Sequence, residues 1–178
     1  AGVNVAGELR DTTLEDWDRL IEVNLKGVVY GTHEAYALMR EQGFGHIVNT
    51  ASLAGLVPPV GEGAYAATKH GAVALSMALR AEARAFGVDV SVVCPGVIET
   101  PMVDTGTYLC LDKDDLLREL PIKLYSVDAT AEIILNGVRR KRAIIIVTAF
   151  ARIAWWIYRL APAASGILAR PMLRRIRR

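Results

Sequence analysis

Tyr65 and Lys69 are two side chains that could carry out acid–base chemistry together. They stand four residues apart in a segment with helical periodicity, so both lie on one face of the expected helix. An ammonium group stabilises a neighbouring phenolate, and we expect Lys69 to lower the pKa of Tyr65 from about 10 toward the working pH. Tyr65 would then serve as a general acid or base. The pair alone favours a plainer alternative, a solvated pair on an exposed helix face.

Three further features with chemical potential lie in order along the chain. Ser52 and Pro95-Gly96 each follow a short apolar, β-branched run that is typical of a strand. Ligands bind at the carboxyl ends of parallel strands, where a hydroxyl such as Ser52 could hold a substrate oxygen. Asn24 lies within a long helical pattern, and its alternative role is a hydrogen bond to a neighbouring backbone carbonyl.

The elements that must position these residues alternate between helix and strand. In chain order we expect helix 12–42, strand 46–50, helix 64–85, strand 88–94, a short acidic helix 112–120, helix 126–138, strand 143–147 and helix 150–160. Alternation of this kind predicts an α/β fold in which helices cover both faces of a parallel sheet.

The ordered set of motifs resembles that of the short-chain dehydrogenase/reductase family. The matching segments are Ala1-Gly2-Val3, Val23-Asn24-Leu25-Lys26-Gly27, Ile47-Val48-Asn49-Thr50-Ala51-Ser52, Tyr65-Ala66-Ala67-Thr68-Lys69 and Pro95-Gly96-Val97-Ile98-Glu99-Thr100-Pro101. Ala1-Gly2 matches the end of the family's Asn-Asn-Ala-Gly motif. The competing match, Asn4-Val5-Ala6-Gly7, leaves too short a connection to Trp17. The resemblance spans residues 1–147 and implies a Rossmann-like, doubly wound parallel sheet.

The resemblance also implies a role for each matching residue. Tyr65 would exchange a proton with the substrate oxygen, and Ser52 would hydrogen-bond the same oxygen. Lys69 would hold the nicotinamide ribose, and Asn24 would anchor a water molecule in a proton relay behind it. The residues that would line an NAD or NADP site are Ala1, Gly2, Tyr65, Lys69, Pro95, Gly96, Ile98 and Thr100.

The chain departs from the family pattern in one respect. It contains no Gly-x-x-x-Gly-x-Gly loop, which cradles the cofactor pyrophosphate in this family. The sequence therefore resembles the C-terminal portion of such an enzyme, its preference for NAD or NADP is not predicted, and we expect this chain alone to be inactive. A catalytically silent binding or scaffold protein on the same fold is the alternative. The three histidines lack metal-ligand spacing, so no metal site is expected.

Charge is distributed unevenly over the 178 residues, 52% of which are hydrophobic. Residues 1–138 hold 10 basic and 19 acidic side chains, whereas residues 139–178 hold 11 basic and none acidic. We therefore distinguish the catalytic part, residues 1–148, from a basic, amphipathic helical tail, residues 149–178.

Two cysteines are too few for a disulfide framework, and the strand-like surroundings of Cys94 predict a buried thiol in a reducing compartment.

Expectations about the substrate and the partners come from three features: the segment between Met102 and Tyr125, the family resemblance and the basic tail. Apolar residues between Met102 and Tyr125 predict a lipophilic ketone or alcohol as substrate. The family's mode of association implies a homo-dimer or tetramer through helices 12–42 and 64–85. The tail predicts either contact with an anionic membrane surface or packing on the protein itself, in a cytoplasmic protein. Arginines placed among large apolar side chains do not predict nucleic-acid binding.

Overall fold

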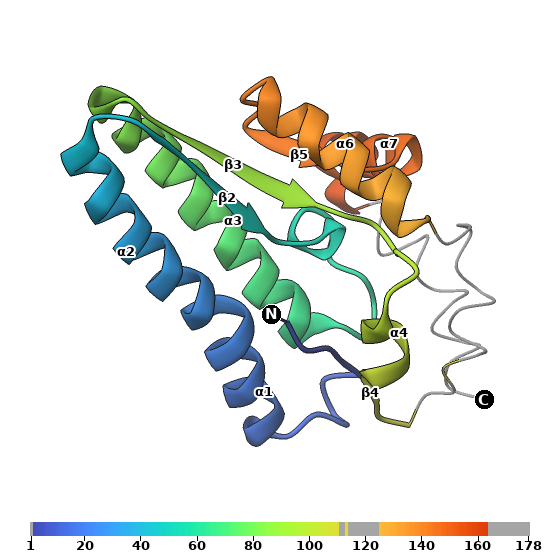
Figure 1. Ribbon diagram of the computed structural model, residues 1–178. Helices are drawn as coiled ribbons and strands as arrows, with labels where there is room; N and C mark the ends of the chain where they lie inside the picture. Colours follow the sequence, from blue (N-terminus) through green and yellow to red (C-terminus); the bar gives the residue numbers. More distant parts are fainter. Residues whose placement is uncertain (1, 111–112, 114–124, 164–178) are drawn as a thin grey trace.

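The structure is a computed structural model that describes residues 2–110, 113 and 125–163. Its centre is a parallel sheet in the order β2-β3-β5, formed by β2 (Gly45–Thr50), β3 (Val88–Cys94) and β5 (Ile144–Ile146), as Figure 1 shows. Val92 and Cys94 of β3 are in register with Ile144 and Ile146 of β5. The α/β fold with parallel strands is therefore confirmed. Within the described residues β2 and β5 are the edges of this sheet, as expected for the strand that bears Ile47.

One continuous helical stretch precedes the sheet and consists of three parts. They are α1 (Leu14–Leu20), a π-helical segment η1 (Ile21–Lys26) and α2 (Gly27–Gln42). Thr13 caps the start in a reciprocal capping box with Asp16, and Gly43 ends it in the left-handed conformation at φ 77°. The extent expected from the sequence is thus correct, whereas the π-helical segment was not predicted.

A second long helix connects β2 to β3. The short 3₁₀ turn η2 (Leu53–Gly55) leads to α3 (Gly63–Ala83), which a second 3₁₀ turn, η3 (Arg84–Phe86), extends. Gly87 then adopts φ 71°, a conformation that favours glycine, and a Cβ there would collide with the carbonyl oxygen of Gly43. The end of α2 at Gly43 and the end of η3 at Gly87 therefore pack closely, and this allows β2 and β3 to start side by side.

The segment after β3 contains small elements that the sequence did not predict. These are α4 (Pro101–Thr105) and a two-residue parallel pairing of β1 (Val5–Ala6) with β4 (Thr107–Tyr108). The acidic helix expected over 112–120 lies outside the described residues. The chain continues with α6 (Val127–Arg139) before β5 and α7 (Ala149–Leu160) after it, close to the bounds expected for both helices.

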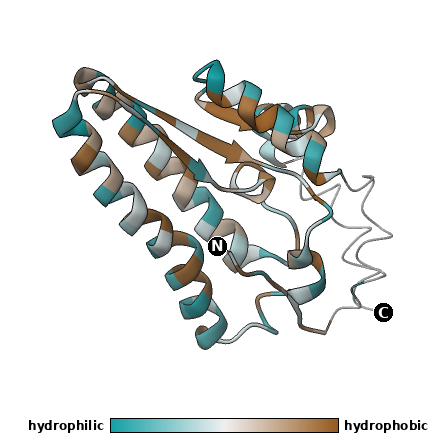
Figure 2. Ribbon diagram, in the orientation of Figure 1, coloured by the Kyte–Doolittle hydropathy of each residue, from teal (hydrophilic) through white to brown (hydrophobic). Residues whose placement is uncertain are grey.

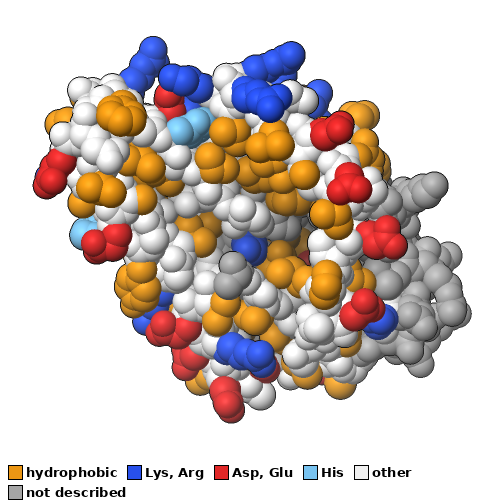
Figure 3. Space-filling view, viewed as in Figure 1, with side chains coloured by type: hydrophobic (Ala, Val, Ile, Leu, Met, Phe, Trp, Pro, Cys, Tyr) orange, Lys and Arg blue, Asp and Glu red, His pale blue; other side chains and the backbone are white. Residues whose placement is uncertain are grey.

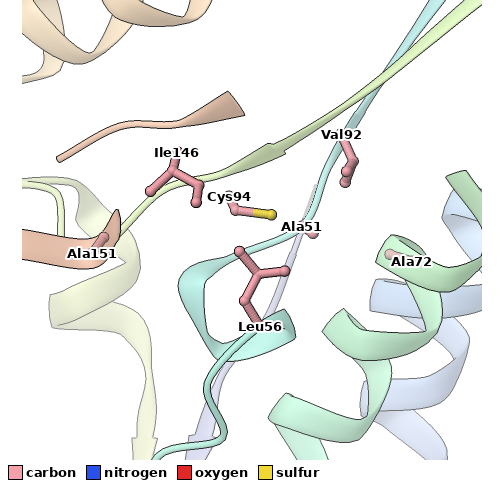
Figure 4. Packing of buried hydrophobic residues seen from close by; sticks show 7 residues of the cluster. All are labelled: Ala51, Leu56, Ala72, Val92, Cys94, Ile146 and Ala151. Atoms are coloured by element: carbon pink, nitrogen blue, oxygen red, sulfur yellow. The ribbon is translucent and has the colours of Figure 1, made fainter. Parts of the chain in front are cut away.

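Helices pack on both faces of the sheet, as predicted. Residues of α3 and α7 share a core cluster with β3 and β5: its buried members are Ala51, Leu56, Ala72, Val92, Cys94, Ile146 and Ala151 (Figure 4). Strand residues alternate between faces, so Ile145 points the other way, and there α6 packs so closely that a Cβ on Gly137 would lie 2.8 Å from the Ile145 side chain. In Figure 2, β3 and β5 are mostly brown, the colour of hydrophobic residues, whereas the helices alternate between brown and teal.

No helix among the described residues has the length and hydrophobicity needed to cross a bilayer.

Candidate active site

The carboxyl ends of the three strands bring Ser52, Pro95 and Thr148 to one edge of the sheet. Just beyond the ladder, the Leu53 amide donates to the Pro95 carbonyl at 2.7 Å. Gly96 faces the residue after β5, because a Cβ on Gly96 would lie 3.8 Å from the Thr148 hydroxyl oxygen. Ser52 and Pro95-Gly96, which the sequence singled out, thus lie together where the fold is expected to bind ligands.

Ser52 is positioned by the 3₁₀ turn that follows it. Its backbone is extended, and its hydroxyl oxygen accepts a hydrogen bond from the Ala54 amide at 3.1 Å. The turn η2 rests directly on α3, since a Cβ on Gly55 would lie only 2.6 Å from the carbonyl oxygen of Lys69. Glycine at this position lets Ser52 approach the helix that carries Tyr65 and Lys69.

Tyr65 and Lys69 form a buried pair on α3, with 8% and 4% of their surfaces exposed. The alternative of a solvated surface pair is therefore wrong. The ammonium nitrogen of Lys69 lies 5.5 Å from the centroid of the Tyr65 ring. Among the described residues, none forms a hydrogen bond with this ammonium group. Burial lowers the pKa of Lys69, and the nearby Cys94 thiol acts in the opposite direction.

The pKa of Tyr65 shifts in the direction opposite to the one expected from the Tyr-x-x-x-Lys spacing. Burial raises this pKa, a hydrogen bond with Ser52 lowers it, and the charge of Glu62 raises it again. The free-energy cost of removing a phenolate from water raises the pKa more than the hydrogen bond lowers it. The Lys69 ammonium lies over the Tyr65 ring. The protonated phenol is thus favoured at neutral pH, which suits a proton donor.

Asn24 is completely buried within the π-helical segment η1. Its side chain forms two hydrogen bonds with the backbone of Val3: it accepts from the amide at 3.0 Å and donates to the carbonyl at 2.8 Å. π-Helical segments frequently occur at functional sites because they change the direction of one side chain. The alternative of a bond to a neighbouring helix carbonyl is not what the structure shows, because the partner lies 21 residues away.

The Asn24 bonds place the N-terminal segment beside the Tyr65–Lys69 pair. A Cβ on Gly2 would lie 3.3 Å from the Asn24 Oδ1 atom and 3.8 Å from the Lys69 Nζ atom. Gly2 therefore lies beside Asn24 and Lys69, and its role in cofactor binding stays a prediction. Ala1 itself lies outside the described residues.

Ile98 and Thr100 lie in the segment between β3 and α4. Ile98 forms an isolated parallel bridge with Tyr125, and Thr100 is the N-cap of α4 with Pro101 as the first helical residue. Both are partly buried. They follow Gly96 closely in the chain, and their place in the lining of a cofactor site stays a prediction.

Glu62 and Asn4 lie next to the candidate site, and the sequence reasoning missed them. The amide of Asn4 donates to the Glu62 carboxylate at 2.9 Å, and the Asn4 Oδ1 atom is buried without a hydrogen-bond partner. Burial raises the pKa of Glu62, and hydrogen bonding from Asn4 opposes this shift. Glu62 precedes Tyr65 by three residues at the start of α3, a spacing that could have drawn attention to it.

Cys94 lies at the end of β3 behind these residues. Its side chain is fully buried, and burial raises the pKa of the thiol to about 12, against the opposing effects of Ser52 and Lys69. Cys94 is thus the buried free thiol that the sequence predicted. No cluster of His, Cys, Asp and Glu that could hold a metal ion occurs in the described part of the chain.

Comparison with known proteins gives a consistent family match. Residues 1–107 match the family model described as short chain dehydrogenase. A probable oxidoreductase of Mycobacterium tuberculosis, EphD, is 34% identical over 96% of this chain, which spans only 30% of that protein. An acetoacetyl-CoA reductase of Rhizobium meliloti is 42% identical over 57% of this chain and 44% of its own length.

Solved structures show the same architecture. A short-chain dehydrogenase/reductase from Burkholderia phymatum in complex with NAD has a TM-score of 0.80 at 25% identity, over 92% of this chain and 64% of that one. A short-chain dehydrogenase from Sphingobium yanoikuyae in complex with NADPH has a TM-score of 0.74 at 26% identity, over 95% and 62%. These matches also confirm the Rossmann-like fold. The chain belongs to the short-chain dehydrogenase/reductase family.

Proposed function

We propose that the protein is an NAD- or NADP-dependent oxidoreductase that interconverts a ketone or aldehyde and an alcohol. The observation that carries this proposal is the convergence of a phenol, a hydroxyl and an ammonium group at the carboxyl ends of the strands. Tyr65, Ser52 and Lys69 come from two different elements, yet they lie together: Ser52 acts on the pKa of the Tyr65 phenol, and the buried Lys69 ammonium nitrogen lies 5.5 Å from the Tyr65 ring centroid. The related oxidoreductases support the same class of reaction.

Tyr65 has the chemistry of the proton donor in the reduction direction. Its buried phenol is protonated at neutral pH and can donate to the oxygen of a carbonyl substrate. Ser52 can hydrogen-bond the same oxygen and hold it against Tyr65. As negative charge develops on the phenol oxygen, the nearby ammonium of Lys69 stabilises it. In the oxidation direction the same groups accept the proton from the alcohol.

A nicotinamide cofactor fits two features of the site. The buried Lys69 ammonium has no hydrogen-bond partner among the described residues, so it can donate hydrogen bonds to ribose hydroxyl oxygens. Gly2 lets the backbone approach Lys69, because a Cβ there would lie 3.3 Å from the Asn24 Oδ1 atom, and a Cβ on Gly96 would lie 3.8 Å from the Thr148 hydroxyl oxygen. When bound, the cofactor supplies or removes the hydride. Asn24 holds Val3 and thereby the segment that leads into β1, against which the cofactor would lie.

The substrate is proposed to be lipophilic apart from the carbonyl or hydroxyl group that reacts. Within the described part of the expected substrate loop, Val103, Tyr108 and Leu109 are partly buried and offer an apolar wall. The expected contributions of Leu111, Leu116 and Leu117 lie outside the described residues. Figure 3 shows the face near the N-terminus hollowed, with hydrophobic side chains around the hollow.

A homo-dimer or tetramer formed through α2 and α3 is part of the proposal. These helices lie side by side in Figure 1 and expose large apolar side chains: Val29, Tyr30, Leu38 and Met77. Burial of such residues between two copies would stabilise the oligomer.

We place the protein in the cytoplasm, peripheral at a membrane.

Dinucleotide-linked turnover tests the proposal against a silent scaffold protein. Full-length protein is incubated with NADH or NADPH and cyclic, steroid and long-chain ketones, and cofactor oxidation is followed by absorbance. We expect turnover, and a loss of about 10²-fold in the Ser52→Ala variant, because a hydrogen bond to the reacting oxygen is removed. Ser126→Ala is the control, since it removes a helix cap outside the site. Dinucleotide binding without turnover of any compound would instead support the scaffold alternative.

A further inference from the structure

Helix α7 is apolar on two opposite sides. Toward the protein, Ala151 is completely buried and Trp155 packs against the core cluster of β3 and β5. On the opposite side five large apolar residues face solvent: Phe150 at 42% exposure, Ile153 at 59%, Trp156 at 49%, Ile157 at 49% and Leu160 at 79%. We call these five residues the outer face of α7. At about 100° per residue they fall within about 120° of arc opposite Ala151.

A helix that packs on a sheet normally presents polar residues to solvent, so the outer face requires an explanation. Contiguous exposed apolar residues mark contact sites for proteins or membranes. The charges around the outer face distinguish between these partners. Arg152 and Arg159 lie together on one flank of α7, and the Arg159 guanidinium lies 5.7 Å and 5.9 Å from the ring centroids of Trp155 and Trp156.

The wider surroundings of α7 carry the same sign of charge. Residues 139–178 contain 11 basic and no acidic side chains. Arg139 and Arg140, at the end of α6, are exposed, and Figure 3 shows Lys and Arg side chains gathered along the edge where α6 ends in Figure 1. Lys141 differs because it forms an ion pair with Asp89 at 2.6 Å.

This charge pattern disfavours two other occupants of the outer face. In a two-fold contact with the two α7 helices antiparallel, the arginine flanks would be brought together without acidic partners from this region. The second alternative occupant is the C-terminal segment, residues 164–178. It contains five arginines and no acidic residue, so its charge would repel the arginines on the flank of α7. An anionic lipid surface supplies both the apolar layer and the opposite charge.

We propose that the outer face of α7 binds the surface of an anionic membrane, with the helix parallel to the plane of the bilayer. Twelve residues span about 18 Å, which is less than the roughly 30 Å of the hydrocarbon core, so α7 lies along the interface. Trp156 is placed at headgroup depth, where tryptophan is enriched, and Arg152 and Arg159 reach the lipid phosphates. The bilayer would thereby bring the enzyme close to lipophilic compounds dissolved in it.

Vesicle sedimentation tests this proposal without any measurement of enzyme activity. Full-length protein is mixed with vesicles of phosphatidylglycerol and phosphatidylcholine, or of phosphatidylcholine alone, at low salt and above physiological salt. We expect binding to the anionic vesicles, weaker binding at high salt, and a blue shift of tryptophan fluorescence. In the double variant Ile153→Ser and Ile157→Ser the partition coefficient should fall about tenfold or more.

The double variant Leu9→Ser and Leu14→Ser is the matched control. It also replaces two exposed leucine-sized side chains, at 74% and 83% exposure, but at the far end of the molecule beside α1. It should bind vesicles like the wild type. The proposal is overturned if the wild type does not bind anionic vesicles, or if both double variants bind equally. It is also overturned if the α7 variant changes only the oligomeric state, because a second copy would then be the occupant.

Discussion

Replacement of Asn24 by alanine tests how the π-helical segment positions the site. Asn24 is fully buried and forms both of its hydrogen bonds with the backbone of Val3. Loss of two hydrogen bonds at about 1 kcal/mol each, with partly buried backbone groups left unpaired, should lower the free energy of unfolding by about 2–3 kcal/mol. For a domain of this size we expect the midpoint of thermal unfolding to fall by about 4–12 °C.

Turnover should fall by more than this loss of stability explains. Without Asn24, the segment that holds Gly2 beside Lys69 is free to shift, and a displacement of about 1 Å at a reacting centre can lower the rate about 10²-fold. We therefore expect kcat of Asn24→Ala to fall about 10–100-fold at a temperature where the variant is folded. Circular dichroism and initial rates on the full-length protein measure both effects.

Asn49→Ala is the control for this experiment. Asn49 is also buried and also forms two hydrogen bonds, accepting from Thr32 at 3.1 Å and donating to Ser76 at 3.0 Å, but neither partner is a candidate site residue. Its replacement should cause a similar loss of stability and leave kcat within about twofold. If both variants lose activity equally, or if Asn24→Ala keeps normal turnover, the positioning role of Asn24 is wrong.

Three further predictions concern Glu62, the cysteines and Gly55. Glu62→Gln removes a negative charge that raises the pKa of Tyr65, so the limb of the pH–rate profile that reports Tyr65 should move to lower pH in either reaction direction; no movement would contradict the coupling. Cys110 should react with iodoacetamide in the native protein and Cys94, with a pKa of about 12, only after denaturation, as peptide mapping can show; native labelling of Cys94 would contradict its burial. Gly55→Ala should destabilise the protein by about 1–3 kcal/mol in thermal unfolding, because its Cβ would collide with the Lys69 carbonyl, whereas Gly31→Ala, with open space around it, should not; equal effects would argue against close packing of η2 on α3.

The larger elements were predictable because their patterns are long and regular. The helices over 12–42 and 64–85 carry apolar residues at helical spacing over several turns, and β3 is a run of seven mainly β-branched residues. In contrast, β1 and β4 have two residues each, too few for any alternation to be visible. The π-helical segment was also hidden, since six residues do not reveal a change of helical period.

The candidate site was predictable in its members but not in its electrostatics. The spacing of Tyr65 and Lys69 shows that the two share a face, yet it cannot show that the face is buried, and burial decides the sign of the Tyr65 pKa shift. The Asn4–Glu62 hydrogen bond joins residues 58 positions apart. Contacts of this kind depend on the fold, and no local pattern in the sequence indicates them.

The most direct test of the proposed chemistry is the turnover of full-length protein that carries Tyr65→Phe. This change removes only the hydroxyl from a buried ring, so the fold and dinucleotide binding should persist. Tyr30→Phe, which removes the hydroxyl of an exposed tyrosine on α2, is the control and should retain normal turnover. We predict that kcat/KM of Tyr65→Phe falls by about 10²–10⁴-fold, the contribution typical of general acid–base catalysis. A folded Tyr65→Phe variant with turnover within about twofold of the wild type would contradict the assignment of Tyr65 as the proton-transfer group.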